Sequence, residues 1–88
     1  MNVRYEARFE RDLRNIRNKN LLQRMRNVID EVKKAGNTQQ ISNLKKLKGY
    51  EIFYRIKLGD YRIGIEIVED EIIFVRFLHR REVYRFFP

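Results

Sequence analysis

The sequence contains no cysteine, which excludes a disulfide framework, an iron–sulfur cluster and a thiol nucleophile. It has one proline, and 43% of its residues are hydrophobic, so the composition is that of a folded domain rather than a disordered tail. No apolar run resembles a signal peptide or reaches the ~18 residues of a membrane span. We therefore expect a single domain over residues 1–88 that is cytoplasmic and does not contact a membrane.

Several catalytic arrangements are also missing. The chain has one histidine, and its aspartates fall on different predicted elements without the spacing of metal ligands. The only serine, Ser42, has no Ser-His-Asp context, and no glycine-rich phosphate loop precedes a helix. These absences predict that the protein uses no metal and no cofactor.

Acidic residues are scarce relative to basic ones. Twelve Asp and Glu stand against 20 Lys and Arg, which gives a formal net charge of +8. On so small a protein this excess favours a polyanionic partner such as nucleic acid, an acidic protein or an anionic membrane surface. A basic surface that only maintains solubility is the alternative.

The apolar pattern predicts an α+β fold with the element order β-α-α-β-β-β. Apolar residues at helical spacing from Phe9 to Ile16 and from Leu21 to Val32 indicate two helices, the second ending near Gly36, while 37–49 is polar and loop-like. Four strands are expected, at residues 1–6, 51–58, 61–68 and 72–78. We expect an antiparallel sheet of about four strands with a two-helix hairpin packed on one face.

The Gly59-Asp60 turn fixes the register of the central hairpin, since a two-residue loop with glycine first is a strong hairpin signal. One face then carries the apolar side chains that the helices should cover, namely Tyr54, Ile56, Leu58, Tyr61, Ile63 and Ile65. The other face carries Arg55, Lys57 and Arg62 beside Gly64. Like charges opposed on a sheet are destabilising, so this cluster predicts a phosphate-binding surface, and a strand glycine often marks the close approach of a ligand or backbone. A solvated face is the alternative.

The tail from His79 to Pro88 mixes basic and aromatic side chains, a composition typical of single-stranded RNA grooves. Phe86 and Phe87 fit better as core residues that hold the tail. If RNA is cleaved, the nucleophile can be its own 2′-hydroxyl, and the protein must neutralise the phosphorane and protonate the leaving oxygen. Clustered cations supply the first need, and Tyr84 or His79 can assist the acid–base steps.

These motifs resemble those of the RelE/ParE superfamily of bacterial and archaeal toxins. The similarity covers almost the whole chain and is carried by Leu47-Lys48-Gly49, by the hairpin from Tyr54 to Arg62 and by the closing segment from His79 to Tyr84. For the RelE branch, the resemblance implies metal-independent cleavage of messenger RNA in the ribosomal A site until a cognate antitoxin wraps the toxin. We expect no counterpart here of the C-terminal helix that some members carry.

The resemblance also implies site residues. Catalytic roles are expected for Arg55, Lys57, Arg62, Arg80 and Tyr84, with His79 as a further candidate. His79 is retained because Arg55 stands where some members have lysine, and arginine, which stays protonated in proteins, is a poor general base. RNA contacts are expected from Lys45, Lys46, Lys48, Arg76, Arg81 and Arg85.

Three functions remain possible for the sequence. The first is a ribosome-dependent endoribonuclease that inhibits translation. The second is a ParE-like poison of DNA gyrase, and the third is a noncatalytic RNA-binding module. For the first we expect two partners, a cognate antitoxin in a hetero-oligomer and a ribosome with messenger RNA in its A site.

Overall fold

Five strands and three α-helices make up the structure, and the computed structural model describes all 88 residues. The strands are β1 (Asn2–Tyr5), β2 (Leu44–Lys46), β3 (Phe53–Leu58), β4 (Tyr61–Val68) and β5 (Glu71–His79). The helices are α1 (Ala7–Arg14), α2 (Lys19–Lys34) and α3 (Val83–Phe86), with a short 3-10 turn at Thr38–Gln40.

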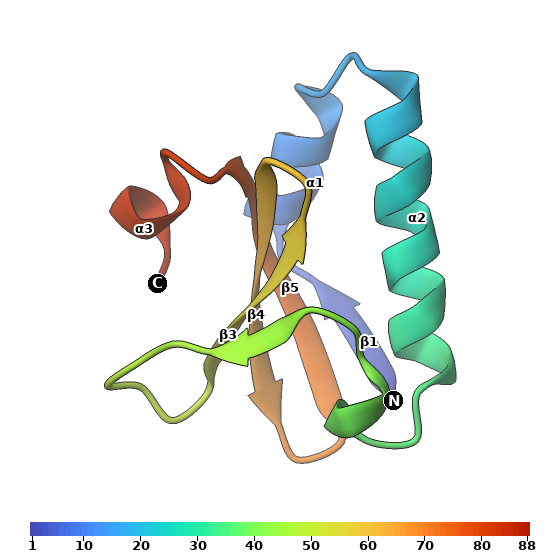
Figure 1. Cartoon of the computed structure of the whole chain (residues 1–88), viewed down its shortest axis with the longest axis vertical. Coiled ribbons are helices and arrows are strands. Elements are labelled where there is room, and N and C mark those ends of the chain that lie inside the picture. The colour runs from blue at the N-terminus through green and yellow to red at the C-terminus, as the bar shows by residue number, and fades with distance from the viewer.

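All five strands form one sheet in the order β1-β5-β4-β3-β2. Helices α1 and α2 cover one face of this sheet, and α3 lies on the opposite side together with the loop between β2 and β3 (Figure 1). The predicted α+β class and the helix hairpin on one face are confirmed. The sheet has five strands instead of about four, and the tail, for which we expected no helix, forms one helical turn.

The sheet departs from the prediction in two places, and both lie at its edges. β1 pairs in parallel with β5, with Asn2 opposite Glu71, so the expectation of an antiparallel sheet is wrong at this edge. The long connection between the two strands is what parallel neighbours require. At the other edge, β2 lies within the expected loop and pairs with β3, with Lys45 opposite Arg55. Three residues are too few for an alternating pattern to be recognised.

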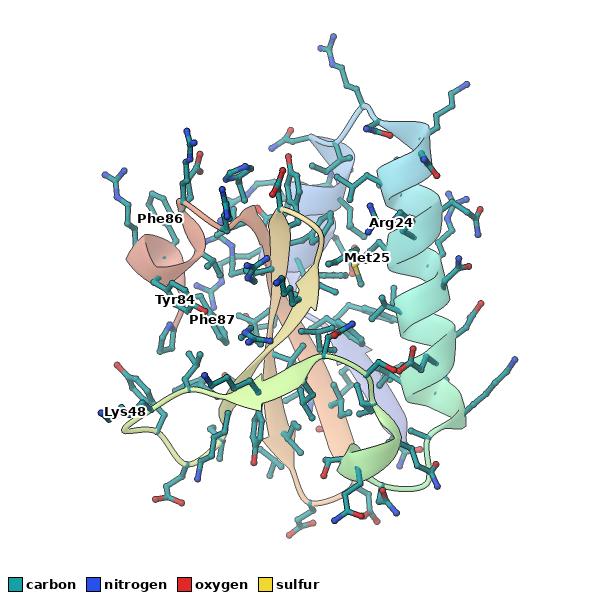
Figure 2. All side chains as sticks on the ribbon, in the orientation of Figure 1. Arg24, Met25, Lys48, Tyr84, Phe86 and Phe87 are labelled. Carbon is teal, nitrogen blue, oxygen red and sulfur yellow. The ribbon has the colours of Figure 1, made fainter.

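Helix α2 begins directly after its N-cap residue, Asn18. The Asn18 side chain accepts a hydrogen bond of 3.0 Å from the Leu21 amide and so satisfies one of the free donors of the first turn. The helix ends at Lys34, two residues before the predicted stop at Gly36. Its apolar side faces the sheet, with Met25 only 1% exposed (Figure 2). Neither α2 nor any other helix combines the length and apolar character needed to cross a membrane.

The predicted hairpin register is confirmed. Leu58 pairs with Tyr61, and Lys57 pairs with Arg62. The main core therefore lies between the hairpin and the helices. It includes Phe9, Leu21, Met25, Val32, Ile56, Ile63, Ile65, Phe74 and Phe77. Burying these apolar side chains, at roughly 25 cal/mol per Å², is what holds the helices on the sheet.

A second, smaller core lies on the opposite face of the sheet. It consists of Val75, Val83 and Phe87 with partly buried neighbours that include Leu47 and Phe53. A β-bulge in the pairing of β4 with β5 inserts one extra residue, because Gly64 pairs with Arg76 whereas Ile65 pairs with Phe74. The tail therefore folds back against an apolar patch on the face that also carries the cations.

The prediction about Gly64 is corrected by this packing. A Cβ atom at Gly64 would lie 2.7 Å from the ring of Phe87, so the glycine makes room for the protein's own tail and not for a ligand. Phe87 is 2% exposed and belongs to the core as expected. Phe86 is 48% exposed, so the same expectation is wrong for it.

We expect Gly64→Ala to lower the free energy of unfolding by about 1–3 kcal/mol, because the added methyl group overpacks the Phe87 ring. Urea titration would measure the loss. Gly36→Ala is the matched control, since its Cβ would meet only the flexible Gln40 side chain at 3.6 Å. Equal stability of the two variants would contradict the conclusion that the Phe87 ring leaves no room for a side chain at position 64.

Candidate active site

Five of the predicted site residues line one cleft of about 250 Å³. The lining residues are Lys45, Lys46, Leu47, Lys48, Arg55 and Tyr84. β2 and the loop after it form one wall and α3 forms the other; Lys48 and Tyr84 mark these two sides (Figure 2). No carboxylate lines the cleft, and the cations Lys45, Lys48 and Arg55 line it. Lys46 also lines it, but it is opposite Tyr54, which packs against the helix-side core, so its side chain points to the other face of the sheet.

Backbone contacts hold the guanidinium of Arg55 in this cleft. Its Nη1 donates a hydrogen bond of 2.7 Å to the carbonyl oxygen of Asn43. Asn43 has a φ of 63°, a left-handed conformation in which asparagine is enriched, and this turn directs its carbonyl to Arg55. Lys45 faces Arg55 across the strand pair. The ammonium of Lys46 lies 3.7 Å from the carboxylate of Glu51, which is 95% exposed and neutralises little.

An aromatic chain fixes the loop between β2 and β3 against the tail. The rings of Tyr50 and Phe53 meet edge to face at 5.4 Å, and those of Phe53 and Phe87 meet at 5.6 Å. Gly49, with a φ of 86°, makes the turn before Tyr50. Sequence reasoning did not single out Tyr50, which is 46% exposed at the loop tip. Its position directly after the Leu47-Lys48-Gly49 motif was the available signal.

Tyr84 reaches the cleft from α3. Its side chain is 59% exposed, whereas the preceding Val83 is fully buried in the second core. α3 contains a single turn, in which the Phe87 amide donates to the carbonyl of Val83 at 2.8 Å. The phenol is thus presented to solvent on a segment that Val83 and Phe87 anchor.

Lys57 and Arg62 extend the cationic surface along the hairpin. They are opposed in the register, and Lys57 lies two residues beyond Arg55 on the same face of β3. The guanidinium of Arg62 donates to the carbonyl oxygens of Gly59 and Tyr61 at 2.8 and 2.9 Å. These bonds hold the guanidinium beside the turn.

The arginines of the tail are spread over a wider surface. The backbone amide of Arg80 donates a hydrogen bond of 2.7 Å to the backbone carbonyl of Asp60. The Nε of Arg80 lies 3.9 Å from the side-chain carboxylate of Asp60. Arg80 therefore belongs to the turn end of the hairpin. Arg81 is exposed, and the guanidinium of Arg85 lies over the ring of Phe86 at 5.6 Å.

His79 lies apart from the cleft. It pairs with Tyr61, whose side chain packs against the core beneath the helices, and their rings meet at 5.5 Å. His79 lines a different cavity, of about 220 Å³, together with α1 residues. Its Nδ1 accepts a hydrogen bond of 3.2 Å from the Arg81 amide. The geometry therefore does not bring His79 together with Arg55.

Arg76, expected to contact RNA, is instead held inside the protein. Its Nε and Nη2 donate to the two carboxylate oxygens of Asp12 at 2.8 and 3.2 Å, and the two side chains are only 11% and 7% exposed. Asp12 also accepts the Phe77 amide at 2.9 Å. The partners are 64 residues apart in the sequence, so no local pattern pointed to them.

Known proteins are similar to this chain in sequence and in fold. A family model described as the ParE toxin of the type II toxin–antitoxin system parDE matches residues 3–84. The chain is 38% identical to Toxin RelE3 of Methanocaldococcus jannaschii over 89 residues, which cover all of both chains.

Solved structures of toxin–antitoxin proteins are also similar to this chain. The toxin-like chain in the RelB–RelE antitoxin–toxin complex from Methanococcus jannaschii is 36% identical, with a TM-score of 0.81 over 97% of this chain and 99% of that one. The YoeB dimer from Staphylococcus aureus, at 13% identity, shares the fold with a TM-score of 0.72 over 90% and 95% of the two chains. The chain belongs to the RelE/ParE superfamily of type II toxin–antitoxin toxins and is a toxin of the RelE family.

Proposed function

We propose that this toxin is a metal-independent endoribonuclease that cuts messenger RNA on the ribosome and thereby inhibits translation. The observation that carries the proposal is the cleft lined by Lys45, Lys48 and Arg55 together with the exposed Tyr84. Cations in a cleft that no carboxylate lines suit a phosphodiester, and an exposed aromatic ring suits an unpaired base.

In the proposed reaction the substrate supplies the nucleophile. The 2′-oxygen bonds to the adjacent phosphorus, the bond from phosphorus to the 5′-oxygen breaks, and the products carry a 2′,3′-cyclic phosphate and a 5′-hydroxyl. One proton leaves the 2′-hydroxyl and one reaches the departing 5′-oxygen. Arg55, Lys57 and Arg62 neutralise the charge that builds on the phosphorane. Arg80 contacts the RNA backbone near the turn of the hairpin.

Tyr84 is the best-placed group for proton transfer in this scheme. Among the cleft residues it carries the only hydroxyl, since the others are cations and one leucine. Arg55 remains protonated and cannot serve as a base. His79 lies with the residues beneath α1, so the proposal gives it no catalytic role.

The proposal is tested by single-turnover cleavage of message on programmed ribosomes. We expect Arg55→Ala to slow cleavage by about 10²–10³, because one cation that stabilises the transition state is lost. Arg26→Ala is the matched control, since Arg26 is exposed on α2, which covers the other face of the sheet. A phosphorothioate at the scissile position tests the absence of a metal: rescue by a thiophilic ion would contradict it. If Arg55→Ala cleaved message at the wild-type rate, the assignment of this cleft as the active site would be wrong.

Two other functions would give different results. A ParE-like poison of DNA gyrase, the alternative that the resemblance implies, would cause gyrase-dependent DNA breaks and leave message intact. A noncatalytic RNA-binding module would occupy ribosomes without producing new transcript ends. Mapping transcript ends and DNA breaks in the same induced cells separates the three functions.

We also propose that a cognate antitoxin binds this chain in a hetero-oligomer. The 36%-identical relative was solved as a RelB–RelE antitoxin–toxin complex, and this chain carries a formal charge of +8. An acidic antitoxin segment over the cleft would neutralise its cations and block access of RNA. Such an association would be faster at low salt, because steering between opposite charges is screened by ions.

A further inference from the structure

We propose that Phe86 and Arg76 are positioning residues that set the orientation of Tyr84 over the cleft, an inference that rests on the proposed function. Contacts run continuously from α1 through β5 to α3: the carboxylate of Asp12 holds the guanidinium of Arg76, which lies under the ring of Phe86, two residues after Tyr84.

The first contact fixes Arg76. The two parallel hydrogen bonds to Asp12, at 2.8 and 3.2 Å, define the plane of the guanidinium as well as its position. The Phe77 amide in turn holds the carboxylate at 2.9 Å. Both charged groups are almost completely buried, so neither has a competing partner in solvent. Arg76 is thus a rigid support at the edge of the sheet.

The second contact is the stacking of Phe86 on that support. The Cζ of Arg76 lies 5.8 Å from the centre of the Phe86 ring, within the range of cation–π attraction. Arg85 contributes a second guanidinium at 5.6 Å. Because the ring is 48% exposed, hydrophobic burial alone does not explain its position, and the guanidinium contacts supply a specific seat.

The third step is geometric. α3 has only four residues, and a single helical turn is not stable in isolation, so its orientation depends on its anchors. Val83 and Phe87 anchor one side in the second core, and Phe86 anchors another on Arg76. Figure 2 shows Phe86 on the upper side of α3, with Tyr84 below it on the side of Lys48. A turn of α3 about its axis would move the phenol relative to the cleft, and the Phe86 seat opposes that movement.

The test removes the ring without unfolding the tail. Phe86→Leu keeps an apolar side chain at a half-exposed position, and Phe86→Tyr keeps the ring as the matched control. In single-turnover cleavage at saturating ribosomes we expect Phe86→Leu to be about 10- to 10²-fold slower, since small displacements of a reacting group have effects of this size. The ribosome concentration for half-saturation should not change, and Phe86→Tyr should cut at the wild-type rate.

Combining the change with Tyr84→Phe distinguishes positioning from a separate role. If Phe86 acts only through the Tyr84 hydroxyl, Phe86→Leu should cause no further loss in the Tyr84→Phe background. Losses that multiply would show that Phe86 acts on the RNA or ribosome independently and would overturn the proposal, as would a wild-type rate for Phe86→Leu. Arg76→Lys keeps the charge but not the planar group, so the fraction of it that is folded by circular dichroism should show the Phe86→Leu defect, and a wild-type rate for that fraction would overturn the role of Arg76.

An NMR measurement addresses the inference without cleavage. With ¹³C-labelled tyrosine, Phe86→Leu should shift the ring signals of Tyr84 and leave those of the distant Tyr5 unchanged. Should the wild-type protein cut no RNA, the proposed function fails while these signals still report whether Phe86 seats Tyr84. An unshifted Tyr84 ring would refute the positioning role.

Discussion

Tyr84→Phe is expected to slow cleavage of ribosome-bound message by about 10²–10⁴ while leaving RNA affinity nearly unchanged. The substitution removes only the hydroxyl. The ring remains on α3, at the edge of a cleft whose other polar residues are all cations, so stacking on a base should persist. The proton that the 5′-leaving oxygen requires, however, would lose its positioned donor.

Single-turnover rates and binding constants measured on the same programmed ribosomes would separate the two roles of Tyr84. Tyr84→Ala serves as the comparison, because it removes the ring as well and should weaken RNA binding by roughly 1–3 kcal/mol per stacked base. A phenylalanine variant that cuts at the wild-type rate would assign Tyr84 to stacking alone and leave the proton transfer without a group in the cleft.

Asp12→Ala is expected to lower the free energy of unfolding by about 3–5 kcal/mol, because it leaves the buried guanidinium of Arg76 without a counter-charge and the Phe77 amide without an acceptor. Domains of this size have a total stability of only about 5–15 kcal/mol, so a large part of it would be lost. Urea denaturation followed by circular dichroism would measure the change.

Two comparisons show whether burial causes this effect. Glu6→Ala removes the partner of Arg8 in a surface ion pair and should cost no more than about 1 kcal/mol. The double variant Asp12→Leu with Arg76→Met replaces the pair by apolar side chains. It should be more stable than Asp12→Ala, because no charge is left buried, although the Phe77 amide still lacks its acceptor. If the double variant were as unstable as Asp12→Ala, the buried charge would not be the cause.

The central hairpin and the cleft show what the sequence could predict. A two-residue turn between alternating segments leaves one register, so the pairing of Lys57 with Arg62 and the buried side of the hairpin followed directly. The basic residues of the β2–β3 region and Tyr84 came from motifs, and the structure brings them together in one cleft. These features depend on neighbours in the sequence or on a known pattern.

The errors arise from contacts between distant segments. Arg76 is expected to contact RNA and His79 to assist catalysis, but Arg76 lies at the bulge beside Gly64 and bonds Asp12, and His79 pairs with Tyr61 away from the cleft. Gly64 is expected to mark the close approach of a ligand or of backbone, and nothing in the sequence shows that the group that approaches it is the ring of Phe87. A pattern of period two specifies the face of a side chain only while the strand stays regular, and a bulge changes that face.

The pairing of β1 with β5 has a consequence for synthesis of the protein. Asn2 is made 69 residues before its strand partner Glu71, and the ring of Phe9 on α1 packs 5.2 Å from that of Phe74 on β5. A nascent chain that ends at Val68 can form the β3–β4 hairpin but has neither a neighbour for β1 nor this cover for α1. α3 with Tyr84 emerges later still. Because domains generally fold as whole units, the cleft between β2 and α3 is completed only after residues up to Tyr84 have left the ribosome.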